Sequence, residues 1–189
     1  MKKNRQTIKY FSLIIIVLAF VIGCSKEQKE IIGAIEDRSA APRMHADSVT
    51  TIVSDSGITR YRISAPVWYI YDYNKQEPFW DFPKGIHFER FDQTLKVDAN
   101  IHANYAKFFE NRQLWELKGN VRATNIEGMV FVTEQMFWDQ RAEKIFSDSL
   151  ITITQLDGSK LVGQNGFFAN QQLTQYTVIN SKANIPVKE

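Results

Sequence analysis

The sequence is poor in the residues that most metal and redox sites need. Its 189 residues include one cysteine, Cys24, and three histidines, His45, His87 and His102. One cysteine excludes an intrachain disulfide, and the histidines form no metal-binding motif such as H-E-x-x-H. The chain also lacks a G-x-S-x-G motif and a glycine-rich phosphate loop before a helix. We therefore expect no cofactor and no metal site, and His102 is interpreted as a solvated strand residue.

The charge of the chain is nearly balanced. Lys and Arg number 23 and Asp and Glu number 21, and four of the basic residues lie in the first 23 positions. A nucleic-acid binder needs a positive surface that displaces counterions from phosphates, so nucleic acid is not an expected partner. Hydrophobic residues make up 44% of the chain, which is typical of one folded domain of ordinary size.

A long apolar run occurs only near the N-terminus. Four basic residues precede Tyr10 to Ile22, a run of 13 residues that is apolar apart from Ser12. A permanent membrane helix needs about 20 residues, whereas this length suits the apolar core of an export signal. The run ends in Gly23-Cys24, and a small residue before a cysteine resembles the lipobox of bacterial lipoproteins. We predict that Cys24 becomes the lipidated N-terminus; the alternative is an uncleaved signal anchor.

Composition divides the chain into three parts. Residues 24–43 are polar, mixed in charge and weakly periodic, which favours a tether over a folded element. From residue 44 onward, stretches of alternating apolar and polar residues dominate. The predicted organisation is a lipoprotein signal peptide over 1–23, a lipidated tether over 24–43 and a β-rich domain over 44–185.

Period-2 alternation is the main pattern of the predicted domain. Between Leu95 and Tyr105 every odd position is apolar and every even position is polar, which predicts one long strand with a dry face and a wet face. Turn residues separate this strand from similar stretches that begin at Tyr61, Ile86, Trp115 and Ile151. No stretch beyond the tether has helical periodicity, so the predicted fold class is all-β.

The strands also repeat at a fixed interval. Residues 30 positions apart match in type, as in Ile101, Phe131 and Leu161, in Ala103, Thr133 and Gly163, and in Phe108, Trp138 and Phe168. Several registers agree, which predicts an internal repeat of about 30 residues that contributes strand, turn, strand and turn. Stacked units of this kind predict an elongated antiparallel β-jellyroll or folded sheet whose two ends expose unpaired strand edges.

The apolar faces of stacked units would line one continuous interior, an apolar trough. Its predicted lining consists of inward residues of the alternating strands, namely Ile63, Leu95, Val97, Ile101, Tyr105, Trp115, Val121, Phe131, Ile151, Ile153 and Leu161. Catalysis is not expected there. The acidic residues that a glycoside hydrolase would pair sit beside alternating apolar residues, as on a solvated face; these are Asp81, Glu89, Glu116 and Asp139.

Aromatic residues crowd into positions 68–82, next to Pro66, Pro78 and Pro83. Such a cluster suits a platform on which sugar rings stack, or a cap or core that closes the trough. We favour the cap or core. Exposure of Trp80 and Tyr71 on a closed sandwich would instead favour glycan binding.

Several short motifs, taken in order, resemble the LptC family. They are Ile63-Ser-Ala65-Pro66, Trp80-Asp-Phe82-Pro83-Lys-Gly85-Ile86, Leu117-Lys-Gly119-Asn120-Val121, Thr133-Glu134-Gln-Met-Phe-Trp138-Asp139, Ile145-Phe-Ser147-Asp148 and Gly163-Gln-Asn-Gly166. The resemblance covers about residues 44–182. This family is the membrane-attached periplasmic component of lipopolysaccharide export, related to the OstA-like β repeats of its soluble partner LptA. The resemblance implies a β-jellyroll whose interior holds the acyl chains of lipid A.

The resemblance also implies the partners. The N-terminal edge would meet an ABC transporter of the LptB, LptF and LptG type, and the C-terminal edge would pass lipopolysaccharide to LptA-like strands by edge-strand pairing. Well-known family members keep a transmembrane helix, whereas this sequence predicts attachment to the membrane through an N-terminal lipid. The expected location is the periplasmic face of the inner membrane, with the outer membrane as the alternative.

The predicted function is passive lipopolysaccharide transport. An acyl chain of about twelve carbons left in water costs about 10 kcal/mol, at about 0.8 kcal/mol per methylene, so the lipid needs shielding while it crosses the periplasm. The alternative from another class is a cell-envelope lipoprotein whose β domain binds glycans or protein, or acts as a passive spacer. An open apolar groove favours transport over these alternatives.

Overall fold

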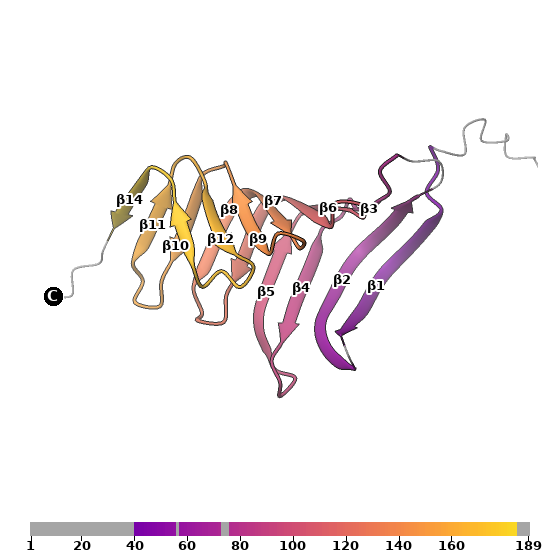
Figure 1. Ribbon diagram of the computed structural model, residues 1–189, viewed down its shortest axis with the longest axis horizontal. Helices are drawn as coiled ribbons and strands as arrows, with labels where there is room; N and C mark the ends of the chain where they lie inside the picture. The colour runs from indigo at the N-terminus through magenta and orange to yellow at the C-terminus, as the bar shows by residue number, and fades with distance from the viewer. Residues whose placement is uncertain (1–39, 56, 73–75, 185–189) are drawn as a thin grey trace, which may run out of the picture. The chain divides into compact units, whose positions relative to one another are not determined.

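The computed structural model describes residues 40–55, 57–72 and 76–184, which form one antiparallel sheet of 14 strands (Figure 1). Contacts divide the chain into residues 1–36 and 37–189, and all described residues belong to the second unit. The predicted signal peptide, Cys24 and residues 24–39 of the predicted tether lie outside the described residues. The all-β fold class is confirmed, because every regular element of the described residues is a strand.

Three long strands connect two layers of this sheet. They are β2 (Ile58–Tyr71), β7 (Leu114–Thr124) and β8 (Val130–Asp139). One part of each pairs with the first layer, which contains β4 (Ile86–Phe91), β5 (Val97–Ala103), β10 (Ile151–Thr154), β11 (Lys160–Gly163) and β14 (Ser181–Asn184). The other part pairs with the second layer, which contains β3 (Phe79–Phe82), β6 (Tyr105–Phe109), β9 (Lys144–Ser147), β12 (Phe167–Asn170) and β13 (Tyr176–Val178). Strand β1 (Met44–Asp55) pairs with β2 along its length.

The change of layer shows in the spacing of buried side chains. In β8, Phe131 and Thr133 are buried in the first layer, and Met136 and Trp138 are buried in the second, so the alternation skips one residue. The β7–β8 pairing is interrupted at the same level, between Lys118 and Val121. Such irregularities bend a strand and re-aim its side chains. Each long strand can therefore contribute an inward face to both layers.

The 30-residue interval is confirmed in the first layer and fails in the last unit. Ile101, Phe131 and Leu161 share one cross-strand register through β7 and β10. Phe168, by contrast, is 55% exposed, and its neighbour Ala169 is the buried residue. At the change of layer, the buried residues Thr133 and Met136 of β8 are three positions apart. The corresponding buried residues Gly163 and Phe167 are four positions apart, so every buried position of β12 lies one residue later than the 30-residue interval predicts.

Gly166 accommodates the extra residue between Gly163 and Phe167. It has a φ of +89°, and a Cβ at this position would lie 1.9 Å from the carbonyl oxygen of Ser147. Both the backbone conformation and the close approach exclude a side chain. Gly166 lies in the connection between β11 and β12.

The predicted single strand from Leu95 to Tyr105 is wrong. The structure has two strands there, β5 and β6, and the chain bends at Asn104, whose N–H donates to the carbonyl oxygen of Gly119 at 3.0 Å. The alternating pattern runs without interruption through a change of layer. Alternation alone therefore does not locate the bend.

Candidate functional site

The inward side chains of the first layer form a continuous line across eight strands, which we call the first-layer row. Each member is the direct cross-strand partner of the next, from β2 at one end to β14 at the other. The row consists of Ile63, Phe88, Ile101, Ala123, Phe131, Ile153, Leu161 and Ala183. Because only one face of each strand points inward, this register places an uninterrupted apolar strip on the interior side of the layer.

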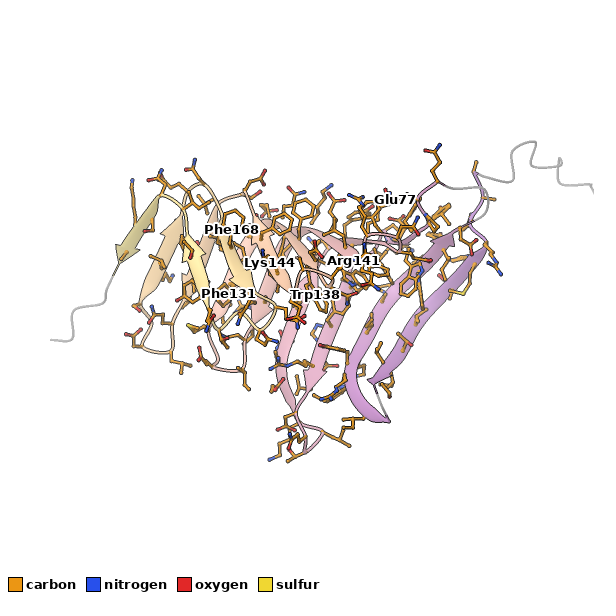
Figure 2. All side chains as sticks on the ribbon, viewed as in Figure 1. Glu77, Phe131, Trp138, Arg141, Lys144 and Phe168 are labelled. Atoms are coloured by element: carbon orange, nitrogen blue, oxygen red, sulfur yellow. The ribbon has the colours of Figure 1, made fainter. Side chains whose placement is uncertain are left out.

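A corresponding second-layer row faces it and is richer in aromatic residues. It consists of Ile70, Trp80, Phe108, Trp115, Trp138, Ile145, Ala169 and Tyr176. The two rows touch across the interior: the Phe88 and Trp115 rings lie edge to face with centroids 4.7 Å apart, and Phe131 and Tyr176 do so at 5.4 Å. Figure 2 labels Phe131 and Trp138, one residue from each row.

The predicted cap or core is confirmed for three aromatic residues at positions 68–82, namely Trp68, Trp80 and Phe82. Tyr69, Tyr71 and Phe79 are partly buried residues outside this core, and Tyr73 lies outside the described residues. Phe82 is 2% exposed, and Trp68 packs against both Trp80 and Phe82 with centroid distances of 5.0 and 5.6 Å. The Trp80 indole N–H donates to the Glu110 carboxylate. Tyr71 stacks on Phe79 at 4.8 Å. Trp80 is therefore held between the layers by its neighbours and does not form an exposed sugar platform.

Eight of the eleven predicted lining residues point into this interior. Five belong to the first-layer row, namely Ile63, Ile101, Phe131, Ile153 and Leu161. Val121 and Ile151 are both fully buried, and both are cross-strand partners of Thr133, next to the first-layer row. Trp115 belongs to the second-layer row. The three others are Leu95, Val97 and Tyr105, and the structure places them elsewhere.

Leu95 lies in the β4–β5 turn and Val97 is the first residue of β5, and neither side chain lies in the interior. Their side chains are 63% and 42% exposed. The Asp92 carboxylate organises this turn, because its Oδ1 accepts the backbone N–H groups of Thr94 and Lys96 at 2.7 and 2.9 Å. The bond from Lys96 is the largest of the effects that hold the pKa of Asp92 below its usual value. Leu95 adopts a left-handed φ of 62° within the turn.

Tyr105 points to the outer side of the second layer. Its cross-strand partner is the exposed Lys118, whereas the next residue, Ala106, is fully buried. Burial, followed by a hydrogen bond with Asp81, raises the pKa of the Tyr105 phenol above its usual value. In β5 the odd-numbered residues face inward, as Ala103 does, whereas in β6 the even-numbered residues do, as Ala106 does. This change explains why Tyr105, an odd position of the alternating pattern, faces outward.

In this structure the protein's own side chains fill most of the interior. Phe131, Ile151 and Ile153 are fully buried. A pocket remains beside the middle of the first-layer row, with a volume of about 50 Å³; its lining includes Tyr61, Phe88, Ala99, Ile101, Trp138 and Leu173. A dry cavity of about 150 Å³ holds a single benzene molecule. An acyl chain therefore needs the interior to widen.

The loop between β12 and β13, residues 171–175, covers this pocket, and we call it the strap. Leu173 at its centre is 3% exposed. The Leu173 carbonyl oxygen accepts a hydrogen bond of 2.9 Å from Nδ2 of Asn125, which directly follows β7 and is 2% exposed. Sequence reasoning missed both residues, because the strap lies in a polar stretch without periodicity. The 30-residue interval does offer one signal. The turn that begins at Asn125 recurs at Gln155 with the same backbone hydrogen bond, but Gln155 is exposed whereas Asn125 is buried.

Strand edges remain at both ends of the sheet. Within the described residues, β1 pairs only with β2, β13 only with β12, and β14 only with β11. In β1, Ile52 and Val53 are 52% and 41% exposed. An unpaired edge presents backbone N–H and C=O groups that a strand of another protein can pair with. The two layers thus end in one edge strand at the N-terminal end and in two at the C-terminal end.

The acidic residues weighed for chemistry are engaged in separate local contacts. Glu89 accepts a hydrogen bond of 2.5 Å from Arg62, and this bond holds the Glu89 pKa below its usual value. Glu116 contacts Lys118 at 2.6 Å, and Asp139 accepts the backbone N–H of Ala142 at 2.8 Å. Asp81 faces Tyr105. These contacts account for Glu89, Glu116 and Asp139 as part of the sheet surface, whereas Oδ1 of Asp81 is buried without a hydrogen-bond partner among the described residues.

The histidines lie on the surface of the domain. His45 is 3.3 Å from Asp47, and His87 is 3.9 Å from Glu89, with both imidazole side chains partly exposed. His102 is the cross-strand partner of His87. Among residues 40–55, 57–72 and 76–184, no group of three His, Cys, Asp or Glu side chains is arranged to hold a metal ion. The same part of the chain contains no helix of the length and apolarity that crossing a membrane requires.

Most of the sequence matches a protein family. The family described as "Lipopolysaccharide-assembly, LptC-related" matches residues 12–182. No curated protein matches the chain. The matched family consists of lipopolysaccharide-transport components of the periplasm that are tied to the inner membrane, and it is not known as a family of enzymes. The match covers the predicted β domain up to residue 182 and extends N-terminally to residue 12. The chain therefore belongs to the LptC family.

Proposed function

We propose that the space between the two layers holds the acyl chains of lipid A while the domain relays lipopolysaccharide from an ABC transporter of the LptB, LptF and LptG type to an LptA-like protein. The observation that carries this proposal is the first-layer row, which presents one apolar strip across eight strands. Such a strip replaces the hydrocarbon of a bilayer. The step needs binding and release but no catalytic group.

The energetics favour an extended strip over a single deep pocket. Shielding one acyl chain of about twelve carbons from water is worth about 10 kcal/mol. A site that held the whole chain with that free energy would release it slowly. A row of similar apolar positions, running from Ile63 to Leu161, offers comparable contacts along its length, so the chain can move without full exposure to water.

The unpaired edges suit the two proposed partners. The N-terminal edge β1 would meet the transporter, and the C-terminal edges β13 and β14 would extend into the strands of an LptA-like protein. Strand addition at β14 would continue the first-layer row into the partner, and addition at β13 would continue the second-layer row, because side chains alternate between the two faces of a strand. At β1 the residue opposite Ile63 is Thr51. Ala183 is the last member of the row and lies on β14 itself.

The proposed anchor is a lipid on Cys24. In this proposal residues 1–23 are removed as a signal peptide, residues 24–43 form the tether, and the β domain spans 44–185. Attachment would hold the domain at the periplasmic face of the inner membrane. Metabolic labelling with a clickable fatty acid tests this: the wild-type chain should incorporate the label, and Cys24→Ser should not. Labelling of the Cys24→Ser variant would contradict the anchor.

Site-specific photo-crosslinking tests lipid binding in the interior. A photo-crosslinking amino acid replaces Ile101 in one full-length variant and His102 in another, in cells that make lipopolysaccharide. The two residues are neighbours on β5, but Ile101 belongs to the first-layer row and His102 is exposed. We expect lipopolysaccharide adducts at position 101 and not at 102. Equal adducts at both positions, or adducts only at 102, would overturn the proposal.

A further inference from the structure

The strap crosses the interior partway along the first-layer row. Leu173 lines the pocket together with Phe88 and Ile101. Its bond to Asn125 is made at the turn between β7 and β8. Ile101 on β5 therefore lies on the N-terminal side of this crossing, and Leu161 on β11 lies on the C-terminal side.

The interior is closed immediately beyond the crossing. Tyr176, which follows the strap, packs edge-on against Phe131 at 5.4 Å, and its hydroxyl lies 3.9 Å from Sδ of Met129. Phe131 also contacts Phe167 with centroids 6.1 Å apart. A hydrocarbon chain that moves along the row toward Leu161 must therefore displace both Leu173 of the strap and Tyr176, which follows the strap directly.

The strap has its own internal order. Oδ1 of Asn170 accepts the backbone N–H groups of Thr174 and Gln175 at 2.9 and 3.2 Å, and the N–H of Leu173 donates to the carbonyl oxygen of Asn170 at 2.9 Å. These bonds stay within the second layer. The turn is thus held at its base independently of the first layer.

The tip of the strap, by contrast, is attached through one hydrogen bond to the first layer and one buried side chain, Leu173. Within the described residues, the bond from Asn125 is the hydrogen bond that joins the strap to the first layer. Leu173 has a left-handed φ of 57°, a conformation that is unfavourable for a leucine. Loss of one bond and withdrawal of one side chain would therefore release the tip while the base keeps its shape.

We propose that the strap is a gate that divides the acyl-chain path into a receiving section on the side of Ile101 and a forwarding section on the side of Leu161. Leu173 closes the path when it is seated against Asn125. Release of Leu173 lets hydrocarbon pass beneath the strap toward β11. This inference rests on the proposed function, because it concerns the same interior.

A reversible lock tests the gate in the full-length protein. Asn125→Cys and Leu173→Cys are combined, and disulfide formation is followed by the gel shift of free thiols after alkylation. The two single-cysteine variants are the controls, and they also report any pairing with Cys24. A photo-crosslinking amino acid is then placed at Ile101 or at Leu161 in the locked background.

The two crosslinking positions separate the gate from the proposed function. In the oxidised variant we expect lipopolysaccharide adducts to persist at position 101 and to fall to background at 161, with recovery at 161 after reduction. Undiminished adducts at 161 in the oxidised variant would overturn the gate alone. Absence of adducts at both positions in the reduced variant would overturn the proposed function, and the gate with it.

Two further variants test the gate without a disulfide. Leu173→Ala removes the closing side chain, and Leu156→Ala is its matched control, because Leu156 is an 80% exposed leucine at another turn. Asn125→Asp keeps the acceptor oxygen that binds Glu127 and Met129 but loses the donor to Leu173.

The opening variants should act in the direction opposite to the lock. We expect Leu173→Ala and Asn125→Asp to raise the adduct yield at 161 severalfold and to speed amide hydrogen exchange over residues 171–176. Leu156→Ala should change neither. Faster exchange in both opening variants with an unchanged yield at 161 would overturn the gate, since the strap would then be open without consequence.

Discussion

The N-terminal and C-terminal sections of the domain use the same strand pattern but differ in how tightly they close. In the N-terminal section, from β1 to β6, Ile101 is only partly buried and the pocket lies beside it. In the C-terminal section, from β8 to β14, Phe131, Ile153 and Phe167 are fully buried. Every ion pair of the described residues involves residues up to Lys118.

A repeated sequence pattern therefore does not make a uniform interior. The register of the first-layer row is continuous through both sections, so the difference arises from side-chain size and from the strap. Large side chains and the inserted Leu173 close the C-terminal section. Surface ion pairs contribute little stability individually, so the N-terminal section depends on its own buried residues, such as Phe82 and Ile86.

The largest expected effect is the loss of a fully buried side chain from the C-terminal section. Phe131→Ala should destabilise the domain by about 3–5 kcal/mol, because it leaves a cavity among residues that cannot collapse freely. Ile101→Ala, its counterpart in the N-terminal section, should cost only about 1 kcal/mol because Ile101 is partly exposed. Urea unfolding of both variants measures the contrast, and equal losses would contradict the asymmetry.

Two glycines test the same contrast in the backbone. Gly166 and Gly85 have similar φ values of +89° and +91°, but an added Cβ would lie 1.9 Å from a backbone oxygen at Gly166 and 2.7 Å from one at Gly85. Both substitutions with alanine carry the left-handed penalty of about 1–2 kcal/mol. We expect Gly166→Ala to cost more than Gly85→Ala, as measured by thermal unfolding. The reverse order would show that the N-terminal section is the more rigid one.

Acid should loosen the pairing of β2 with β4 in the N-terminal section. The bond from Arg62 lowers the pKa of Glu89 in the folded protein, so its stabilising contribution is present above the unfolded pKa and is lost as pH falls through the folded pKa. Hydrogen exchange should therefore rise in β2 and β4 below the ordinary glutamate pKa. Glu89→Gln should remove this pH dependence. An unchanged profile in that variant would exclude the ion pair as the cause.

The smallest expected effect concerns a leucine with the same backbone conformation as Leu173 but no buried role. Leu95 has a φ of 62° and is 63% exposed. Leu95→Asn should stabilise the domain slightly, by about 0.5 kcal/mol, because asparagine tolerates this conformation. The same change at Leu173 should destabilise it, since the interior contact is lost. Denaturation midpoints of the two variants should thus move in opposite directions.

The sequence was most informative where strands are regular. Alternation and the 30-residue interval predicted the all-β fold and five members of the first-layer row, because cross-strand register preserves both patterns. Leu95 and Tyr105 were misplaced since alternation continues through a turn and through a change of layer. A skip in buried spacing, as between Thr133 and Met136, marks that change, and it is visible only once the pairing is known.

The second layer and the strap were harder to predict. Phe88 and Trp138 line the pocket from different layers, and their contact depends on how the sheet folds over, which no local pattern records. Leu173 stands alone among polar residues, so hydrophobic periodicity assigns it no partner. Asn125 resembles an ordinary turn residue, and only the three-dimensional structure shows its bond to Leu173.

The most direct measurement of the central claim is a photo-crosslinking profile along β8 in the full-length protein. Phe131 and Thr133 face the interior, and Val132 between them lies on the other side of the strand. The account predicts lipopolysaccharide adducts at positions 131 and 133 and none at 132. A profile without this alternation, or one that peaks at 132, would show that hydrocarbon does not travel between the two layers.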